Sequence, residues 1–296
     1  MTRVRRHGRG HRAADHDSRH RTRSVPRLGP TGGRWGVLHA GKHRSGRLRQ
    51  LRDDPDLGRC RRGKHPNPVD DLDPAQPVPG NGTLLAKELA TIDQISAGRL
   101  TVGLAVGNRE DDFTATATDY KGRGAAQDAL LTELKAVWAG ESRGVAGAVG
   151  PAPVQPGGPP LLIGGTGPAA MRRTVEFGAG WIGGGGEWSA SRASSKRSAR
   201  VWAEAGREGR PRFNALAYFS LGPDAVVASR RYLLDYYGFL GETTGYVAAG
   251  ALTTEDAVRT EVGRFAAAGC DELILFPCSP DLAQVDLLAA AALSAH

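Results

Sequence analysis

A glycine-rich turn is the part of this sequence whose residue types most directly indicate chemistry. The stretch PPLLIGGTGPAAMRR joins an apolar run to a helix-forming segment, and between them lie Gly164, Gly165, Thr166, Gly167 and Pro168. Glycines let a ligand approach the main chain, proline suits a first helical turn, and the N–H groups of a helix start attract anions. Two interpretations are open: a cradle for a phosphate group, or a tight connection that needs glycine for geometry alone.

Two further glycine-rich breaks end apolar runs elsewhere in the chain. GRLTVGLAVG predicts a buried strand over 100–106, and AGWIGGG predicts another over 180–183. Apolar runs without alternation are typical of parallel strands that are covered on both faces. In such sheets ligands gather at the C-terminal ends of the strands. Glycine-rich exits at 103–107, 164–167 and 183–186 therefore favour the phosphate cradle over a plain connection.

The segments that must position these breaks alternate between strand and helix patterns. Strand-like runs occur at 100–106, 161–163, 180–183, 213–221 and 272–276. Helix patterns separate them, among them TTEDAVRTEVGRFAAAG, which has a threonine cap, acidic residues in its first turn and a terminal glycine. This alternation predicts right-handed βαβ units and a parallel α/β sheet.

The first 80 residues differ in composition from the rest of the chain. They contain 17 Arg and two Lys against eight Asp and no Glu, a net charge of +11, whereas residues 81–296 have a net charge of −3. They also lack Ile, Phe and Tyr and show neither strand nor helix periodicity. Such a segment buries too little apolar surface to offset its ordering entropy. We therefore divide the chain into an atypical, disordered or out-of-frame segment, 1–80, and a folded portion, 81–296.

Three interpretations of residues 1–80 compete. A basic arm that binds nucleic acid would gain affinity by neutralising phosphates, but aromatic residues are absent apart from Trp35. An organelle transit peptide should be poor in acidic residues, and the eight Asp argue against it. We favour translation out of frame, because Arg, Gly, Pro, His and Ala without Ile, Phe, Tyr or Glu is what a GC-rich coding strand yields in the wrong frame.

Other features narrow the class of protein. Cys60, Cys270 and Cys278 are too few and too irregularly spaced for a disulfide framework, so a cytoplasmic protein is expected, with Cys270 and Cys278 as small core residues. The regularly spaced histidines near the start lie in non-helical surroundings, so we expect no metal site. No apolar stretch approaches the ~18 residues of a membrane span, and we expect no membrane contact.

Three smaller features have structural as well as functional interpretations. The acidic residues 110–112 are predicted to form a solvated loop. The segment DYYGFL, 235–240, lines a substrate entrance in one interpretation and packs a helix end in the other. Trp138, Trp181 and Trp202 are predicted to pack in the core.

Three stretches within residues 83–293 resemble the luciferase-like, flavin- or deazaflavin-dependent oxidoreductases. LLAKELATIDQISAGRLTVGLAVGNREDDF resembles that family's third helix and fourth strand, and PPLLIGGTGPAAMRRTVEFGAGWI resembles its fifth strand, phosphate turn and sixth strand. FAAAGCDELILFP resembles its eighth strand. The resemblance implies a TIM-type (β/α)8 barrel whose first three βα units are unreadable in residues 1–80.

The resemblance also implies a site for FMN or coenzyme F420. The cofactor phosphate would lie on the glycine-rich turn, and the ring or its tail would contact residues that end the fourth and sixth strands. The resemblance identifies no catalytic acid or base in this chain. The implied cofactor-binding residues are Gly107, Asn108, Gly164, Gly165, Thr166, Gly167, Pro168, Gly183 and Gly184.

The function implied by the resemblance is hydride transfer or oxygen insertion on a small organic substrate, and a homodimer is compatible with it. GNREDDF and GGTGP resemble the deazaflavin branch more closely. One alternative is a barrel isomerase or synthase that binds a phosphorylated substrate at the same turn. Another is a non-functional, frame-shifted relative. A barrel without its first three strands has two open edges, so we expect the chain as written to fold poorly or to bind cofactor weakly.

Overall fold

The computed structural model describes residues 36–37, 82–185 and 188–293. The chain divides into two compact units, 1–32 and 33–296, and every described residue belongs to the second. Within this described part, no helix is both long enough and apolar enough to cross a membrane. The same residues contain no group of three His, Cys, Asp or Glu side chains that could hold a metal ion.

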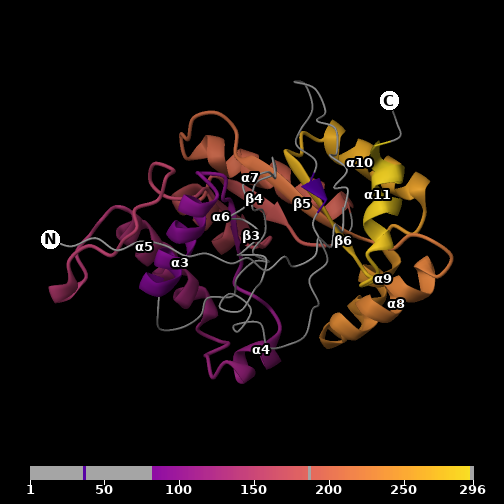
Figure 1. The fold of residues 1–296 in the computed structure, drawn as a ribbon, viewed down its shortest axis with the longest axis horizontal. Coiled ribbons are helices and arrows are strands. Elements are labelled where there is room, and N and C mark those ends of the chain that lie inside the picture. The colour runs from indigo at the N-terminus through magenta and orange to yellow at the C-terminus, as the bar shows by residue number, and fades with distance from the viewer. Residues whose placement is uncertain (1–35, 38–81, 186–187, 294–296) are drawn as a thin grey trace, which may run out of the picture. The chain divides into compact units, whose positions relative to one another are not determined.

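Six parallel strands form one curled sheet in the order β1-β6-β5-β4-β3-β2 (Figure 1). The five strands predicted from apolar runs are confirmed, each within two residues at its ends, and so is their parallel arrangement. The strands are β1 (Gly36–Val37), β2 (Val102–Leu104), β3 (Leu161–Gly164), β4 (Gly180–Gly183), β5 (Arg212–Phe219) and β6 (Glu272–Pro277).

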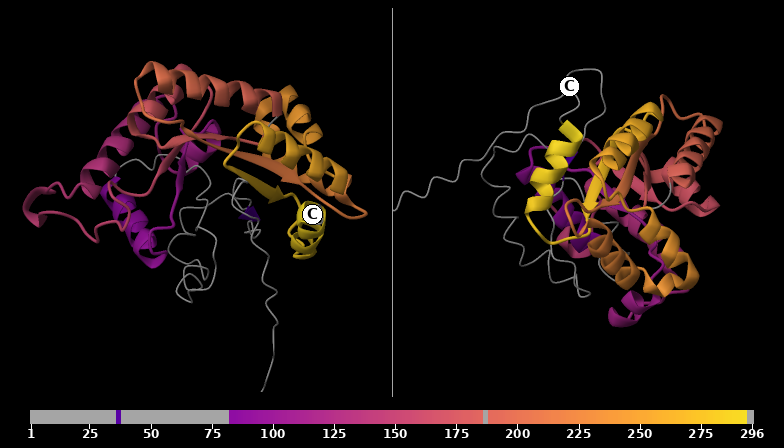
Figure 2. Two further views of the ribbon diagram at one scale, coloured as in Figure 1. Left: turned by 90° about the horizontal axis from the view of Figure 1, so that it is seen from above. Right: turned by 90° about the vertical axis from the view of Figure 1, so that its right-hand side faces the viewer.

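Helices connect the strands and lie along the outer side of the curled sheet, as the left panel of Figure 2 shows. The threonine cap predicted for α10 is present, since Thr254 Oγ1 accepts a hydrogen bond from the backbone N–H of Ala257. The α-helices are α3 (Gly82–Ile95), α4 (Glu110–Ala115), α5 (Arg123–Trp138), α6 (Pro168–Phe177), α7 (Trp188–Glu204), α8 (Ala225–Tyr236), α9 (Thr244–Ala249), α10 (Glu255–Ala267) and α11 (Ala283–Leu293).

The structure differs from the sequence-based expectations in three places. Residues 110–112 form the first turn of α4 instead of a loop, and acidic side chains there face the positive end of the helix dipole. A 3₁₀ helix, η3 (Gly238–Thr243), and α9 follow α8, where no element was predicted. The third is β1, which lies in the segment 1–80 and pairs with β6 through Gly36 and Ile274. The other predictions for that segment lie outside the described residues.

Side chains on the strands alternate between an outer, helix-covered face and an inner face. The outer face belongs to two cores, one of which contains Trp138 and the other Trp181. All three tryptophans predicted to be buried, Trp138, Trp181 and Trp202, are buried. The inner face holds a separate cluster of Leu162, Ile182 and Ile274. Two residues beyond Leu216 and Ile274, the same face presents Tyr218 and Phe276, which are paired in register at the C-terminal ends of β5 and β6.

The predicted roles of the two C-terminal cysteines are confirmed. Cys270 and Cys278 are both buried, and this burial raises the pKa of each thiol to about 12. A protonated, buried thiol is a poor nucleophile and behaves as a small core residue.

Candidate cofactor site

The glycine-rich turn between β3 and α6 has the geometry that the sequence predicts. Gly165 has a φ of 110°, which residues with a side chain rarely adopt, and Gly167 caps the helix that begins with Pro168. The turn from Gly165 to Pro168 is exposed, and a Cβ atom built on Gly167 would meet no atom within 4 Å. The turn therefore presents bare backbone at the start of a ten-residue helix.

Two side chains from neighbouring elements hold the carbonyl groups of this turn. The indole Nε1 of Trp181 in β4 donates to the Gly165 oxygen at 2.7 Å. The guanidinium Nη1 of Arg197 in α7 donates to the Thr166 oxygen at 2.8 Å. Pro168 has no N–H group and the Ala170 N–H donates to the Gly167 oxygen at 3.1 Å, so the N–H groups of Gly167 and Ala169 are those left for a ligand at the start of α6. The Arg197 guanidinium lies at the same turn. This donor set fits a phosphate group.

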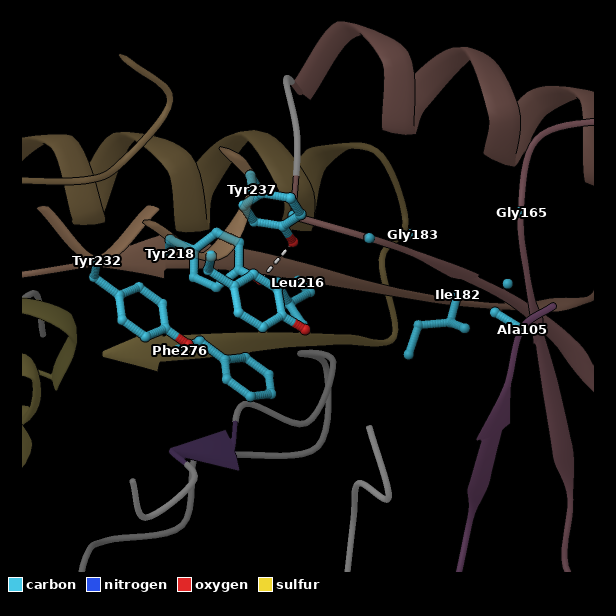
Figure 3. Close-up of a pocket in the computed structure, with 13 residues that line it drawn as sticks. Ala105, Gly165, Ile182, Gly183, Leu216, Tyr218, Tyr232, Tyr237 and Phe276 are labelled. Atoms are coloured by element: carbon cyan, nitrogen blue, oxygen red, sulfur yellow. Dashed lines mark hydrogen bonds between the residues drawn. The ribbon is translucent and has the colours of Figure 1, made fainter. Parts of the chain in front are cut away.

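A cavity of about 160 Å³ opens beside the turn, at the C-terminal ends of the strands (Figure 3). One side, which we call the glycine end, is lined by Ala105, Gly164, Gly165, Gly183 and Gly184. The opposite side, which we call the aromatic end, is lined by Tyr218, Tyr232, Tyr236, Tyr237 and Phe276.

The structure brings four of the implied cofactor-binding residues together at the glycine end. These are Gly164, Gly165, Gly183 and Gly184, contributed by the ends of β3 and β4. Thr166, Gly167 and Pro168 continue from Gly165 as the exposed turn and do not line the cavity itself.

Gly107 and Asn108 lie farther along the loop that follows β2, beyond the cavity-lining Ala105. Gly107 has a φ of 72°, and its carbonyl oxygen accepts a hydrogen bond from Arg123 Nε at 3.2 Å. The Asn108 carbonyl oxygen accepts from the Tyr120 hydroxyl at 3.3 Å. The loop is therefore held by hydrogen bonds from residues that follow it in the chain, Tyr120 and Arg123. Of this loop, only Ala105 lines the cavity.

The aromatic end is centred on a pair of phenol groups. The hydroxyl oxygens of Tyr218 and Tyr237 lie 2.7 Å apart, joined by the hydrogen bond drawn in Figure 3. Burial, followed by the neighbouring phenols, raises the pKa of Tyr218 well above its ordinary value. Sequence analysis did not identify Tyr218. It did identify the segment 235–240, and two of its residues, Tyr236 and Tyr237, line the cavity.

Arg109 fixes the outer edge of the aromatic end. Its Nη1 atom donates to the Tyr236 carbonyl oxygen at 3.1 Å, and its guanidinium lies over the rings of Tyr236 and Phe239 at 5.8 and 5.4 Å. Asp111 accepts from Arg109 Nε at 2.9 Å and balances its charge. Arg109 thereby links the start of α4 to the end of α8 and to η3. α4 and α8 lie near each other in the right panel of Figure 2.

Comparison with known proteins places this architecture in a family. Residues 76–272 match the family model described as luciferase-like monooxygenase, a range that begins and ends earlier than the resemblance noted from the sequence. The chain therefore belongs to the luciferase-like monooxygenase family. Among curated protein sequences, none matches it.

Solved structures share the fold at low sequence identity. Monooxygenase RslO1 from Streptomyces bottropensis is 20% identical, with a TM-score of 0.56 over 75% of this chain and 76% of that one. An F420-dependent secondary alcohol dehydrogenase, solved with an F420-acetone adduct, is 18% identical, with a TM-score of 0.58 over 75% and 78%.

A third solved structure is the coenzyme F420-dependent tetrahydromethanopterin reductase from Methanopyrus kandleri. It is 17% identical, with a TM-score of 0.51 over 73% of this chain and 79% of that one. These likenesses confirm the α/β barrel class. The units predicted for the barrel's first three strands fall in residues 1–80, where only β1 is described.

Proposed function

We propose that this chain is an oxidoreductase that binds FMN or coenzyme F420 and acts on a small organic substrate by hydride transfer or oxygen insertion. The observation that supports this most strongly is the turn itself. Exposed backbone at Gly167, the start of α6 and the Arg197 guanidinium meet beside a cavity whose near side consists of glycines. A phosphate on the turn and a flat ring along the glycine end use both features.

The chain's own residues bind and orient, and the bound cofactor supplies the redox chemistry. The N–H groups at the start of α6 and Arg197 hold the phosphate. Gly184 lets the ring approach the end of β4, since a Cβ atom there would occupy open space, whereas a Cβ atom on Gly183 would point at Trp181 and Ser191. The aromatic end excludes water from the opposite side of the cavity.

Coenzyme F420 is the first cofactor to test. The segments GNREDDF and GGTGP resemble the deazaflavin branch, and the names of two structural relatives state dependence on coenzyme F420. FMN is the second. Titration of the full chain with each, followed by the fluorescence of the bound species, distinguishes them, and a Kd in the micromolar range is expected for one.

A single substitution tests where the phosphate binds. Gly167→Asp adds a side chain where no atom lies within 4 Å, at φ −77° and ψ 166°, which any residue adopts. Aspartate is a favourable N-cap, so the melting temperature should stay unchanged or rise, whereas its charge should abolish binding of the cofactor phosphate. Gly167→Ala is the uncharged control and should bind with a smaller loss.

Two outcomes contradict the proposal. One is that neither cofactor binds the wild-type chain. The other is that the wild type binds a ringless phosphate ester such as glycerol phosphate as tightly as either cofactor, which would favour the isomerase or synthase alternative. Equal cofactor affinity of wild type and Gly167→Asp would show that the phosphate does not bind at this turn.

A further inference from the structure

We infer that the aromatic end of the cavity is a binding site for a neutral, single-ring aromatic compound that carries a hydroxyl group, a phenol. The inference names the class of substrate. It rests on the proposed function in one respect: the bound ring is the reacting part of a substrate only if the chain is the proposed oxidoreductase. The size of the cavity, its lining and the Tyr218–Tyr237 pair each support it.

The size of the cavity limits a ligand at the aromatic end to one six-membered ring. The whole cavity, glycine end included, measures about 160 Å³, which is close to the about 150 Å³ of an apolar protein cavity that holds one benzene molecule. The aromatic end therefore has no room for a larger ring system. The ring of Tyr218 cannot move toward the glycine end, because it lies against the backbone of Gly185. A Cβ atom on Gly185 would be 2.2 Å from Tyr218 Cε2. This contact fixes one wall of the space.

The lining suits an aromatic and uncharged ligand. Tyr218 is edge-on to Tyr237 and Phe276, with ring centroids 6.0 and 6.2 Å apart, and Tyr232 lies 6.4 Å away. Edge-to-face contacts of this kind favour a further aromatic ring over an aliphatic chain of equal area. None of the described lining residues carries a charge, so a carboxylate or ammonium group on the ligand would lose its hydration without gaining a partner.

The Tyr218–Tyr237 pair suits a hydroxyl group on that ring. Each phenol can both donate and accept, so the hydrogen bond between them can run in either direction. When Tyr237 donates, the Tyr218 hydrogen can be given to a ligand oxygen; when Tyr218 donates, its remaining lone pair can accept from a ligand hydroxyl. A ligand hydroxyl matches both arrangements, whereas a carbonyl group matches only the first. A tyrosine hydroxyl is protonated at neutral pH at its ordinary pKa, and burial raises the pKa of Tyr218 further.

Equilibrium binding of three probes to the full chain, without cofactor, tests the inference by saturation-transfer NMR or calorimetry. Phenol should bind with a Kd of about 1 mM or below. Toluene, which has the ring without the hydroxyl, should bind about threefold to tenfold more weakly. Benzoate, which adds a charge, should bind at least about tenfold more weakly than phenol.

Conservative variants locate the hydroxyl contact. Tyr218→Phe keeps the ring and should lower phenol affinity about threefold to tenfold while leaving toluene affinity unchanged. Tyr237→Phe should do the same, since it breaks the same pair. Tyr246→Phe is the matched control, because Tyr246 lies on α9 with 70% of its surface exposed and does not line the cavity. It should change neither affinity.

The inference is wrong if none of the probes binds, if benzoate binds most tightly, or if Tyr218→Phe weakens toluene and phenol equally. Competition between FMN or coenzyme F420 and phenol would also overturn it, because the aromatic end would then belong to the cofactor ring. Loss of cofactor binding by the wild type with phenol binding retained would contradict the proposed function alone.

Discussion

Arg197 Nη1 donates to the Thr166 carbonyl oxygen across 2.8 Å, so a guanidinium from α7 lies at the turn that precedes α6. One donor of the guanidinium is used in this bond, and an arginine has five. The positive charge is therefore positioned at the helix start, where the N–H groups and the helix dipole also favour an anion. Four predictions test this and the surrounding structure.

Removal of the Arg197 charge should weaken phosphate binding specifically. Arg197→Gln keeps a hydrogen-bond donor for Thr166 but loses the charge, so FMN affinity should fall about tenfold, as expected for a charge-assisted hydrogen bond at an exposed site. Riboflavin, which lacks the phosphate, should bind both proteins equally. Arg200→Gln, on the same helix and paired with Glu204, should leave FMN affinity unchanged. An equal loss of riboflavin affinity in Arg197→Gln would argue for a purely structural role.

A side chain at Gly184 should block the glycine end without disturbing the fold. A Cβ atom there meets no atom within 4 Å, so Gly184→Val should unfold at the same urea concentration as the wild type. Its branched side chain occupies the space assigned to the ring, and cofactor affinity should fall at least about tenfold. Gly263→Ala, which is equally open but lies inside α10, should bind normally and be slightly more stable. Unchanged affinity in Gly184→Val would place the ring elsewhere.

Two glutamines should respond to methionine in opposite ways. Neither the nitrogen nor the oxygen of the buried Gln127 side chain has a hydrogen-bond partner among the described residues, so Gln127→Met should raise the free energy of unfolding by about 1–2 kcal/mol. Gln155 Nε2 donates to Asp93 Oδ1 and to the Leu100 oxygen at 2.8 and 2.7 Å, so Gln155→Met should lower it by about 1–3 kcal/mol. Urea titration measures both, and stabilisation by the second variant or destabilisation by the first would contradict the assignment.

Asp128 should make stability depend on pH in the acid range. The hydrogen bond from Arg173, followed by that from Arg172, lowers the pKa of Asp128 below its ordinary value. The unfolded state then binds the proton more tightly, so the ion pairs stabilise the fold fully above that ordinary value, and this contribution is lost as the pH falls through the lower folded pKa. Wild type should exceed Asp128→Asn in urea stability at pH 7, and the difference should shrink below about pH 4. A constant difference at all pH values would exclude this linkage.

The strand and helix order could be predicted from the sequence because its signals are local. Apolar runs without alternation mark β2 to β6, and a glycine followed by proline marks the start of α6 wherever the chain folds. The positive φ of Gly165 and the cap at Thr254 depend on a few neighbouring residues only. For the same reason the glycine end could be predicted, since Gly164 and Gly183 are the last residues of two strands that the sequence identifies, and Gly165 and Gly184 follow them directly.

Residues 110–112 and β1 show where local signals were insufficient. An acidic run is compatible with both a loop and a first helical turn. In the structure it is helical, and the residue before it, Arg109, contacts Tyr236, which is distant in the sequence. The two-residue strand at Gly36 and Val37 has no sequence periodicity, and its pairing with β6 defines it. Both depend on partners that are distant in sequence.

Sequence by itself determined the parallel α/β class and the glycine-rich exits, because backbone conformation responds to nearby residue types. Only the tertiary structure decided that Arg197 reaches Thr166 and that Tyr218 meets Tyr237. The alternation of β5 turns Tyr218 inward, and the register with β6 sets it beside Phe276. The segment after α8 then brings Tyr237 to the same place. Side chains from separate elements converge only when strand order, register and sheet curvature are all set, and no short stretch of sequence encodes these.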